Sequence, residues 1–249
     1  MEANPLTGKA ALVTGAPRRV GRAVALELAR AGLDIAFTYR SSQAEALDLV
    51  RELESLGRRA LAVRADLEDQ NAPETIFNEV SRAFPQLYAL VNNASCFAAS
   101  PLAKLALADF ERNMAVNARA PLFLMQRFAP ALGSHTRPGR IVNFVDIHVL
   151  GQPLKGYVAY NVSKAALLEA TKTLAMELAP RVTVNAVAPG VIAWAESYGP
   201  KAREAYLKRV PLGRAGTPDD AARAVLFLVR DADYTTGQVL RLDGGRLLT

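Results

Sequence analysis

Two residues that could perform acid–base chemistry, Tyr160 and Lys164, stand four positions apart in the segment YNVSK. The segment opens a long stretch of helical periodicity, and residues four apart on a helix share one face. A tyrosine hydroxyl has a pKa near 10, so proton transfer near neutral pH requires a partner that stabilises the phenolate. A lysine ammonium can do this. Such pairs also arise by chance in helices, so the pair needs support from the rest of the chain.

A glycine-containing turn, TGAPRRVG at residues 14–21, follows the apolar run 10–13. A turn of this kind between a strand and a helix lets the backbone approach a pyrophosphate and points N–H groups at it. Arg19 stands where the usual fingerprint has its middle glycine. Alone, such a turn is more often ordinary loop structure, but its place in the first strand–helix unit indicates a dinucleotide site.

The residues at the end of the second strand, YRSS at 39–42, bear on which dinucleotide binds. An NAD site typically has Asp or Glu there to accept hydrogen bonds from the ribose 2′-hydroxyl, but the only nearby acid, Asp34, precedes the strand. Arg18 and Arg40 could instead converge on a 2′-phosphate, helped by a serine hydroxyl, because arginine suits phosphate. The alternative is that both arginines are solvated surface residues. The pattern favours NADPH over NADH.

These residues need a scaffold, and short apolar runs alternate along the chain with segments of helical period. The expected strands are 10–13, 35–39, 60–63, 87–91, 141–145, 182–187 and 239–242, and helices are expected over 20–31, 41–56 and 157–178. Strands that alternate with helices imply right-handed crossovers and a parallel sheet. We expect one α/β domain over residues 1–249: a single Rossmann-type, doubly wound parallel sheet of about seven strands with helices on both faces.

The least regular stretch is 193–212, which contains Gly199, Pro200 and Pro211. An irregular insert in a compact domain is often a lid or binding loop, so this stretch is predicted to be a substrate-binding flap. Its aromatic residues Trp194, Tyr198 and Tyr206 either line the flap or pack a flap helix on the body.

Composition excludes several classes of protein. The net charge is +6, but the 30 Lys and Arg are scattered among 24 acidic residues without a basic run, so we expect no nucleic-acid partner. The single Cys96 cannot form an internal disulfide, and His135 and His148 lack metal-binding partners at suitable spacing. No apolar stretch is long enough to span a bilayer. We expect a cytoplasmic protein without a metal or a membrane partner.

Over essentially its whole length the chain resembles the short-chain dehydrogenase/reductase family. The resemblance rests on TGAPRRVG, Asp66 after the third strand, NNA at 92–94, Asn117, YNVSK, the Pro-Gly pair at 189–190, and DGG at 243–245. It implies a homo-oligomeric oxidoreductase, a homotetramer, that uses NADPH/NADP with a small-molecule substrate.

The resemblance also implies roles for individual residues. Tyr160 would exchange a proton with the substrate, Lys164 would hold the nicotinamide ribose and lower the pKa of Tyr160, and Asn117 would support a relay water. The cofactor contacts would come from Gly15, Arg18, Arg19, Val20, Gly21, Tyr39, Arg40, Ser41, Ser42, Asp66, Leu67, Asn93, Ala94, Ser95, Tyr160, Lys164, Pro189, Gly190 and Ile192.

Three departures from the family pattern resemble its pteridine reductase subgroup: Asp146 in place of the usual catalytic serine, Arg19, and Ser95 after NNA. Phe97 stands where that subgroup stacks the pterin on the nicotinamide. The implied substrate contacts are Ser95, Phe97, Asp146, Tyr160 and Trp194, with Asp146 and Tyr160 delivering the proton. Reduction of a C=N bond needs hydride at carbon and a proton at nitrogen. Otherwise Asp146 only caps a turn and Phe97 only packs the wall.

Asp146 and Tyr160 lie fourteen residues apart, one more than the family's common spacing, which puts a one-residue insertion at about 149–152. The leading hypothesis is NADPH-dependent reduction of a pteridine (dihydrobiopterin, dihydromonapterin or folate-like). A general carbonyl or 3-oxoacyl reductase is the enzymatic alternative, and an NADP(H)-sensing Rossmann scaffold is the non-enzymatic one.

Overall fold

The computed structural model describes residues 6–133, 138–194 and 199–249. Its centre is a seven-stranded sheet in the order β3-β2-β1-β4-β5-β6-β7, and the six neighbouring pairs are all parallel. The strands are β1 (Ala10–Val13), β2 (Asp34–Tyr39), β3 (Ala60–Arg64), β4 (Leu87–Asn92), β5 (Gly139–Phe144), β6 (Val182–Pro189) and β7 (Val239–Leu242).

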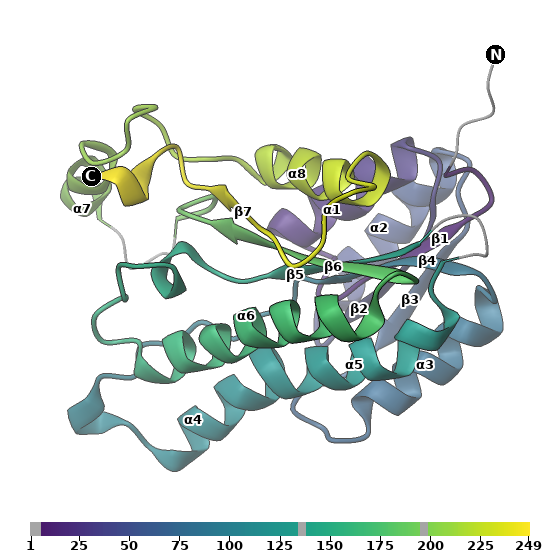
Figure 1. Cartoon of the computed structure of the whole chain (residues 1–249), viewed down its shortest axis with the longest axis horizontal. Coiled ribbons are helices and arrows are strands. Elements are labelled where there is room, and N and C mark those ends of the chain that lie inside the picture. Colours follow the sequence, from purple (N-terminus) through teal and green to yellow (C-terminus); the bar gives the residue numbers. More distant parts are fainter. Residues whose placement is uncertain (1–5, 134–137, 195–198) are drawn as a thin grey trace.

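Helices cover both faces of this sheet (Figure 1). They are α1 (Arg19–Arg30), α2 (Gln43–Ser55), α3 (Ala72–Ala83), α4 (Leu107–Met114), α5 (Ala120–Phe128), α6 (Val158–Leu178), α7 (Pro200–Leu207) and α8 (Pro218–Arg230). Short 3₁₀ turns lie at Leu102–Lys104, Ala129–Ala131, Ile147–Val149 and Arg246–Leu248, and a π-helical turn lies at Ala115–Arg119. Helices α1, α2 and α8 lie on one side of the sheet, and α3, α4, α5 and α6 on the other.

Each face of the sheet has its own apolar core. Along β1, Ala11 and Val13 pack with α1, α2 and α8, whereas Ala10 and Leu12 pack with α3, α5 and α6. All four β1 residues are buried, because side chains that alternate between the two faces meet helices on either side. This explains why the strands appear in the sequence as uninterrupted apolar runs.

The expected doubly wound α/β fold is confirmed, and the strands lie within two residues of their predicted bounds. The predicted flap at 193–212 is more regular than expected, because it contains the helix α7; residues 195–198, including Tyr198, lie outside the described residues. No described helix is long and apolar enough to cross a membrane.

The order of connection reverses at β1: the chain runs outward through β2 and β3, then returns to β4 on the other side of β1. Ligands of open parallel sheets bind in the crevice that such a reversal leaves at the carboxyl ends of the strands. The loops after β1 and β4 border this crevice, and they carry the predicted phosphate turn and the NNA segment.

Candidate active site

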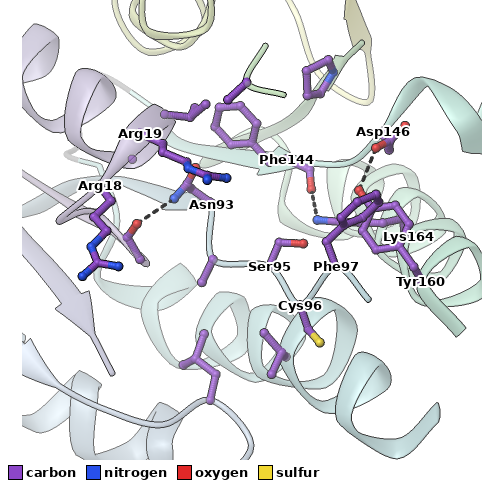
Figure 2. A pocket seen from close by; sticks show the side chains of 18 of the residues that line it. Arg18, Arg19, Asn93, Ser95, Cys96, Phe97, Phe144, Asp146, Tyr160 and Lys164 are labelled. Carbon is purple, nitrogen blue, oxygen red and sulfur yellow. Dashed lines mark hydrogen bonds between the residues drawn. The ribbon is translucent and has the colours of Figure 1, made fainter. Parts of the chain in front are cut away.

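A cavity of about 990 Å³ lies at these carboxyl ends. Its wall contains every cofactor and substrate residue predicted from the sequence: Gly15, Arg18, Arg19, Val20, Gly21, Tyr39, Arg40, Ser41, Ser42, Asp66, Leu67, Asn93, Ala94, Ser95, Phe97, Asp146, Tyr160, Lys164, Pro189, Gly190, Ile192 and Trp194. Arg18 and Arg19 lie at one end, and Asp146, Tyr160 and Lys164 at the other (Figure 2).

The phosphate turn is held tightly against β2 and β4. Gly15 has a φ of +66°, and its N–H donates to Thr38 Oγ1 at 3.1 Å. The Asn93 amide donates to the carbonyls of Thr14 and Gly15 at 2.8 and 3.1 Å. A Cβ on Gly21 would lie 2.4 Å from the Gly15 carbonyl oxygen, so only glycine lets α1 pack this closely.

The start of α1 suits an anion. No side chain caps the helix at Arg18, so N–H groups of its first turn remain available to a bound phosphate. Arg19 has a φ of 51°, in the left-handed region that costs a side chain roughly 1–2 kcal/mol. Uncapped N–H groups and two lining guanidinium groups form a donor set that fits a pyrophosphate.

The two arginines predicted to hold a 2′-phosphate line the cavity, but each also contacts a carboxylate. Arg18 pairs with Glu45 of α2, and Arg40 lies 3.4 Å from Glu68. Arg112 also reaches Glu68, at 3.2 Å. Arg18 and Arg40 are 63% and 64% exposed, so these pairs are weak and a bound phosphate could displace the carboxylates.

The catalytic end of the cavity centres on a hydrogen bond from the Tyr160 hydroxyl to Asp146 Oδ2, 2.7 Å long (Figure 2). Asp146 Oδ1 accepts a second hydrogen bond, at 2.9 Å, from the His148 backbone N–H, and thereby caps the 3₁₀ turn Ile147–Val149. Asp146 therefore does both things considered from the sequence: it caps a turn and it faces Tyr160. The short turn lies within the longer Asp146–Tyr160 connection and leaves the carboxylate directed at the hydroxyl.

Burial, together with the charge of Asp146 and its hydrogen bond, raises the pKa of Tyr160 well above 10. The Lys164 ammonium donates to the Phe144 carbonyl oxygen at 2.7 Å and lies 5.9 Å from the centre of the Tyr160 ring. Burial lowers the pKa of Lys164 to about 8. Lys164 is not among the groups that shift the pKa of Tyr160 in this arrangement, so a lowering of that pKa by Lys164 stays a prediction; Tyr160 rests as a neutral phenol that holds a proton.

The substrate end has aromatic walls. The ring of Phe97 stacks on Tyr157, with centroids 4.7 Å apart and an interplanar angle of 16°, and meets Tyr160 edge-on at 4.8 Å. Phe97 is 44% exposed, so it can still contact a ligand although Tyr157 covers one face. Trp194 meets Tyr206 edge-on at 5.5 Å.

Comparison with known proteins is consistent with this geometry. A family model described as enoyl-(acyl carrier protein) reductase matches residues 15–246. A 3-oxoacyl-[acyl-carrier-protein] reductase of Synechocystis is 36% identical over 247 residues, which cover 98% of each chain. The chain belongs to the short-chain dehydrogenase/reductase family. Together these matches establish the family but not a pteridine substrate.

Two solved structures with a bound nicotinamide dinucleotide superpose closely on this chain. A Burkholderia cenocepacia short chain dehydrogenase in complex with NADP is 39% identical, with a TM-score of 0.91 over 97% of this chain and 99% of that one. A blue fluorescent protein from a metagenomic library, in complex with NADPH, is 37% identical, with a TM-score of 0.89 over 96% and 98% of the two chains.

Asn117 is the one predicted site residue in this short-chain dehydrogenase/reductase that does not line the cavity. It lies in the π-helical turn, fully buried. Its amide accepts from the Cys96 N–H at 2.7 Å and donates to the Cys96 carbonyl at 2.9 Å. It also donates to Ser163. Asn117 thus holds the loop that carries Ser95 and Phe97, and its catalytic role stays a prediction.

Several wall residues were not predicted from the sequence, among them Glu68, Arg112 and Phe144. Glu68 could have been noticed two residues after Asp66, whose carboxylate accepts its N–H at 3.0 Å. The others reach the cavity only through the packing of distant segments. Within the described ranges, no group of three or more His, Cys, Asp or Glu side chains could hold a metal ion.

Proposed function

We propose that this short-chain dehydrogenase/reductase uses NADPH to reduce a C=N bond of a pteridine such as dihydrobiopterin, dihydromonapterin or a folate-like compound. The observation that carries the proposal is the 2.7 Å hydrogen bond between Tyr160 and Asp146, a carboxylate where the family usually has serine. A neutral serine hydroxyl is sufficient for a ketone. A carboxylate also accepts hydrogen bonds from the N–H groups of a flat, donor-rich heterocycle.

NADP(H) is the cofactor, and when bound it supplies the hydride. The phosphate turn and the first turn of α1 would hold the pyrophosphate, Arg18 and Arg40 the 2′-phosphate, and Asp66 the adenine. Lys164 would hold the nicotinamide ribose, with the backbone of Pro189, Gly190 and Ile192 on the carboxamide. The guanidinium of Arg19 would contact the cofactor phosphate or the substrate.

The side chains at the other end of the cavity control the proton. The Tyr160 hydroxyl would donate its proton to the nitrogen of the C=N bond, which together with one hydride on the carbon balances the reduction of one double bond. Burial and the charge of Asp146 keep Tyr160 protonated until then. Ser95 and Phe97 would contact the flat faces and edges of the ring, and Trp194 would close the far side.

A second candidate is reduction of a simple carbonyl, such as a 3-oxoacyl thioester, with Tyr160 protonating the carbonyl oxygen. The name of the Synechocystis relative favours this alternative. A third, an NADP(H)-sensing scaffold without catalysis, makes no use of the Tyr160, Lys164 and Asp146 cluster.

The substrate test measures NADPH oxidation with dihydrobiopterin and with a 3-oxoacyl thioester, for the wild type, Asp146→Ser and the surface control Asp48→Asn. We expect Asp146→Ser to lose at least about tenfold in kcat/KM on the pteridine while retaining thioester activity, and the control to match the wild type. Activity on the thioester alone would refute the pteridine assignment. No activity on either substrate, or an activity that Tyr160→Phe leaves unchanged, would favour the scaffold.

We further propose that residues 1–249 act as one domain in a cytoplasmic homotetramer. Exposed apolar side chains on α5 and α6 support self-association: Leu122 and Phe123 are 40% and 45% exposed, and Val162 and Met176 are 44% and 83% exposed. Exposed apolar side chains on neighbouring helices are typical of the surfaces that subunits bury between them. A lone cysteine suits a reducing compartment.

A further inference from the structure

Tyr206 reaches from α7 to the backbone turn that follows β6. Its hydroxyl oxygen accepts a hydrogen bond from the Val191 N–H at 3.1 Å, although the two residues are fifteen positions apart. A Cβ on Gly190 would lie 3.0 Å from that hydroxyl and 3.2 Å from Asp243 Cα. The turn 190–191 is thus enclosed between Tyr206 and the segment after β7.

The ring of Tyr206 is itself fixed from two sides. Trp194 meets it edge-on at 5.5 Å, and the Arg246 guanidinium lies 5.3 Å from its centre. Arg246 is only 7% exposed and donates to Gln152 Oε1 at 2.8 Å. A cation over an aromatic ring is favourable, more so when little water reaches it, and Tyr206 is half-buried. Burial also raises the pKa of Tyr206, so the phenol stays neutral.

The turn that Tyr206 holds lies beside the catalytic group. Gly190, Val191 and Ile192 line the same cavity as Asp146 and Tyr160, and β6, which they follow, pairs with β5, which Asp146 follows. A backbone group that receives part of a ligand must be fixed before the ligand arrives, or the ordering reduces affinity. The Val191 N–H that Tyr206 holds lies in the peptide directly before the one that joins Val191 to Ile192.

We infer that Tyr206 is a positioning residue, which holds the turn 190–192 in the form that receives the nicotinamide half of NADP(H). This role belongs to neither the pteridine nor the carbonyl hypothesis, because it concerns the cofactor alone. It also gives α7 a function beyond covering the substrate: the helix connects the flap to the nicotinamide site.

The test compares two ligands by calorimetry, NADP⁺ and 2′,5′-ADP, which has the phosphorylated adenosine half but no nicotinamide. Tyr206→Phe removes the hydroxyl and keeps the ring. We expect it to weaken NADP⁺ binding about fivefold, in line with the loss of one hydrogen bond, and to leave 2′,5′-ADP binding unchanged. Tyr234→Phe, at a fully exposed tyrosine, is the matched control and should change neither ligand.

A second variant, Arg246→Met, removes the cation over the ring but keeps an apolar side chain. It should weaken NADP⁺ binding in the same selective way, by about two- to threefold, and it keeps the test informative if Tyr206→Phe folds poorly. Unchanged NADP⁺ affinity in both variants, or an equal loss for both ligands, would overturn the inference. No substrate is added, so a failure of the proposed function leaves the result interpretable.

Discussion

At the scale of single residues, burial and the carboxylate of Asp146 together keep Tyr160 in its protonated form. The hydroxyl hydrogen bond and the negative charge both favour the phenol over the phenolate. In the reductive direction the phenol is the active form, whereas alcohol oxidation needs the phenolate as base. The arrangement therefore keeps Tyr160 near neutral pH in the form that reduction uses.

This bias can be tested with a simple ketone and its alcohol. In Asp146→Ser the pKa of Tyr160 should fall, because the charge that opposes phenolate formation is gone. Reduction should then decline at a lower pH than in the wild type, and oxidation by NADP⁺ should begin at a lower pH. The measurement is kcat/KM against pH in both directions. Identical profiles for the variant and the wild type would show that Asp146 does not control this proton.

Lys164 should leave a signature in stability. Its pKa is about 8 in the folded protein and near 10.4 in an unfolded chain, so between these values the unfolded state binds more protons. The free energy of unfolding should therefore rise with pH from about 8 to 10.4. Lys164→Met should lack this rise, which urea unfolding across the pH range will measure. A parallel rise in both proteins would contradict the lowered pKa.

At the scale of elements, the start of α1 combines the strained backbone of Arg19 with the close packing of Gly21 against Gly15. Arg19→Gly should stabilise the protein by about 1 kcal/mol, because glycine adopts positive φ freely, yet weaken NADP⁺ binding through loss of a lining guanidinium. Arg51→Gly, inside α2, is the control and should destabilise by about 1 kcal/mol. Urea unfolding and calorimetry measure both effects. If Arg19→Gly destabilised the protein like its control, the strain argument would fail.

The elements also show what a sequence alone can predict. The strands and α6 were predictable because apolar periodicity is local, and the glycine turn because Gly21 needs close approach to Gly15. The π-helical turn around Asn117 and the link from Tyr206 to Val191 were not. Both depend on hydrogen bonds to segments fifteen or more residues away, for which no local pattern exists.

At the scale of the whole molecule, the reversal of connection at β1 gathers the site. Arg18 comes from the loop after β1, Ser95 from the loop after β4, and Asp146 from the loop after β5, so residues far apart in sequence share one cavity. That these residues lie at one edge of the sheet could be predicted, because the carboxyl ends of parallel strands meet at the same edge. Contacts between side chains, such as Arg40 with Glu68, could not.

Self-association is also a property of the whole molecule. If the apolar side chains on α5 and α6 join subunits, Phe123→Asp should lower the mass in solution below that of a tetramer, because burying an unpaired charge is costly. Leu47→Asp, at an exposed apolar residue of α2, is the control and should leave the mass unchanged. Light scattering after size exclusion measures both. A wild-type mass equal to one chain would exclude self-association.

The pairing of Arg40 with Glu68 has a consequence for how coenzyme preference could change. Glu68 lines the cavity and is held by two guanidinium groups, those of Arg40 and Arg112. Replacing Arg40 by alanine would both remove a phosphate donor and leave the carboxylate less neutralised, where it repels a phosphate and accepts hydrogen bonds from sugar hydroxyls. One substitution would then shift the enzyme toward NADH through two effects of the same sign.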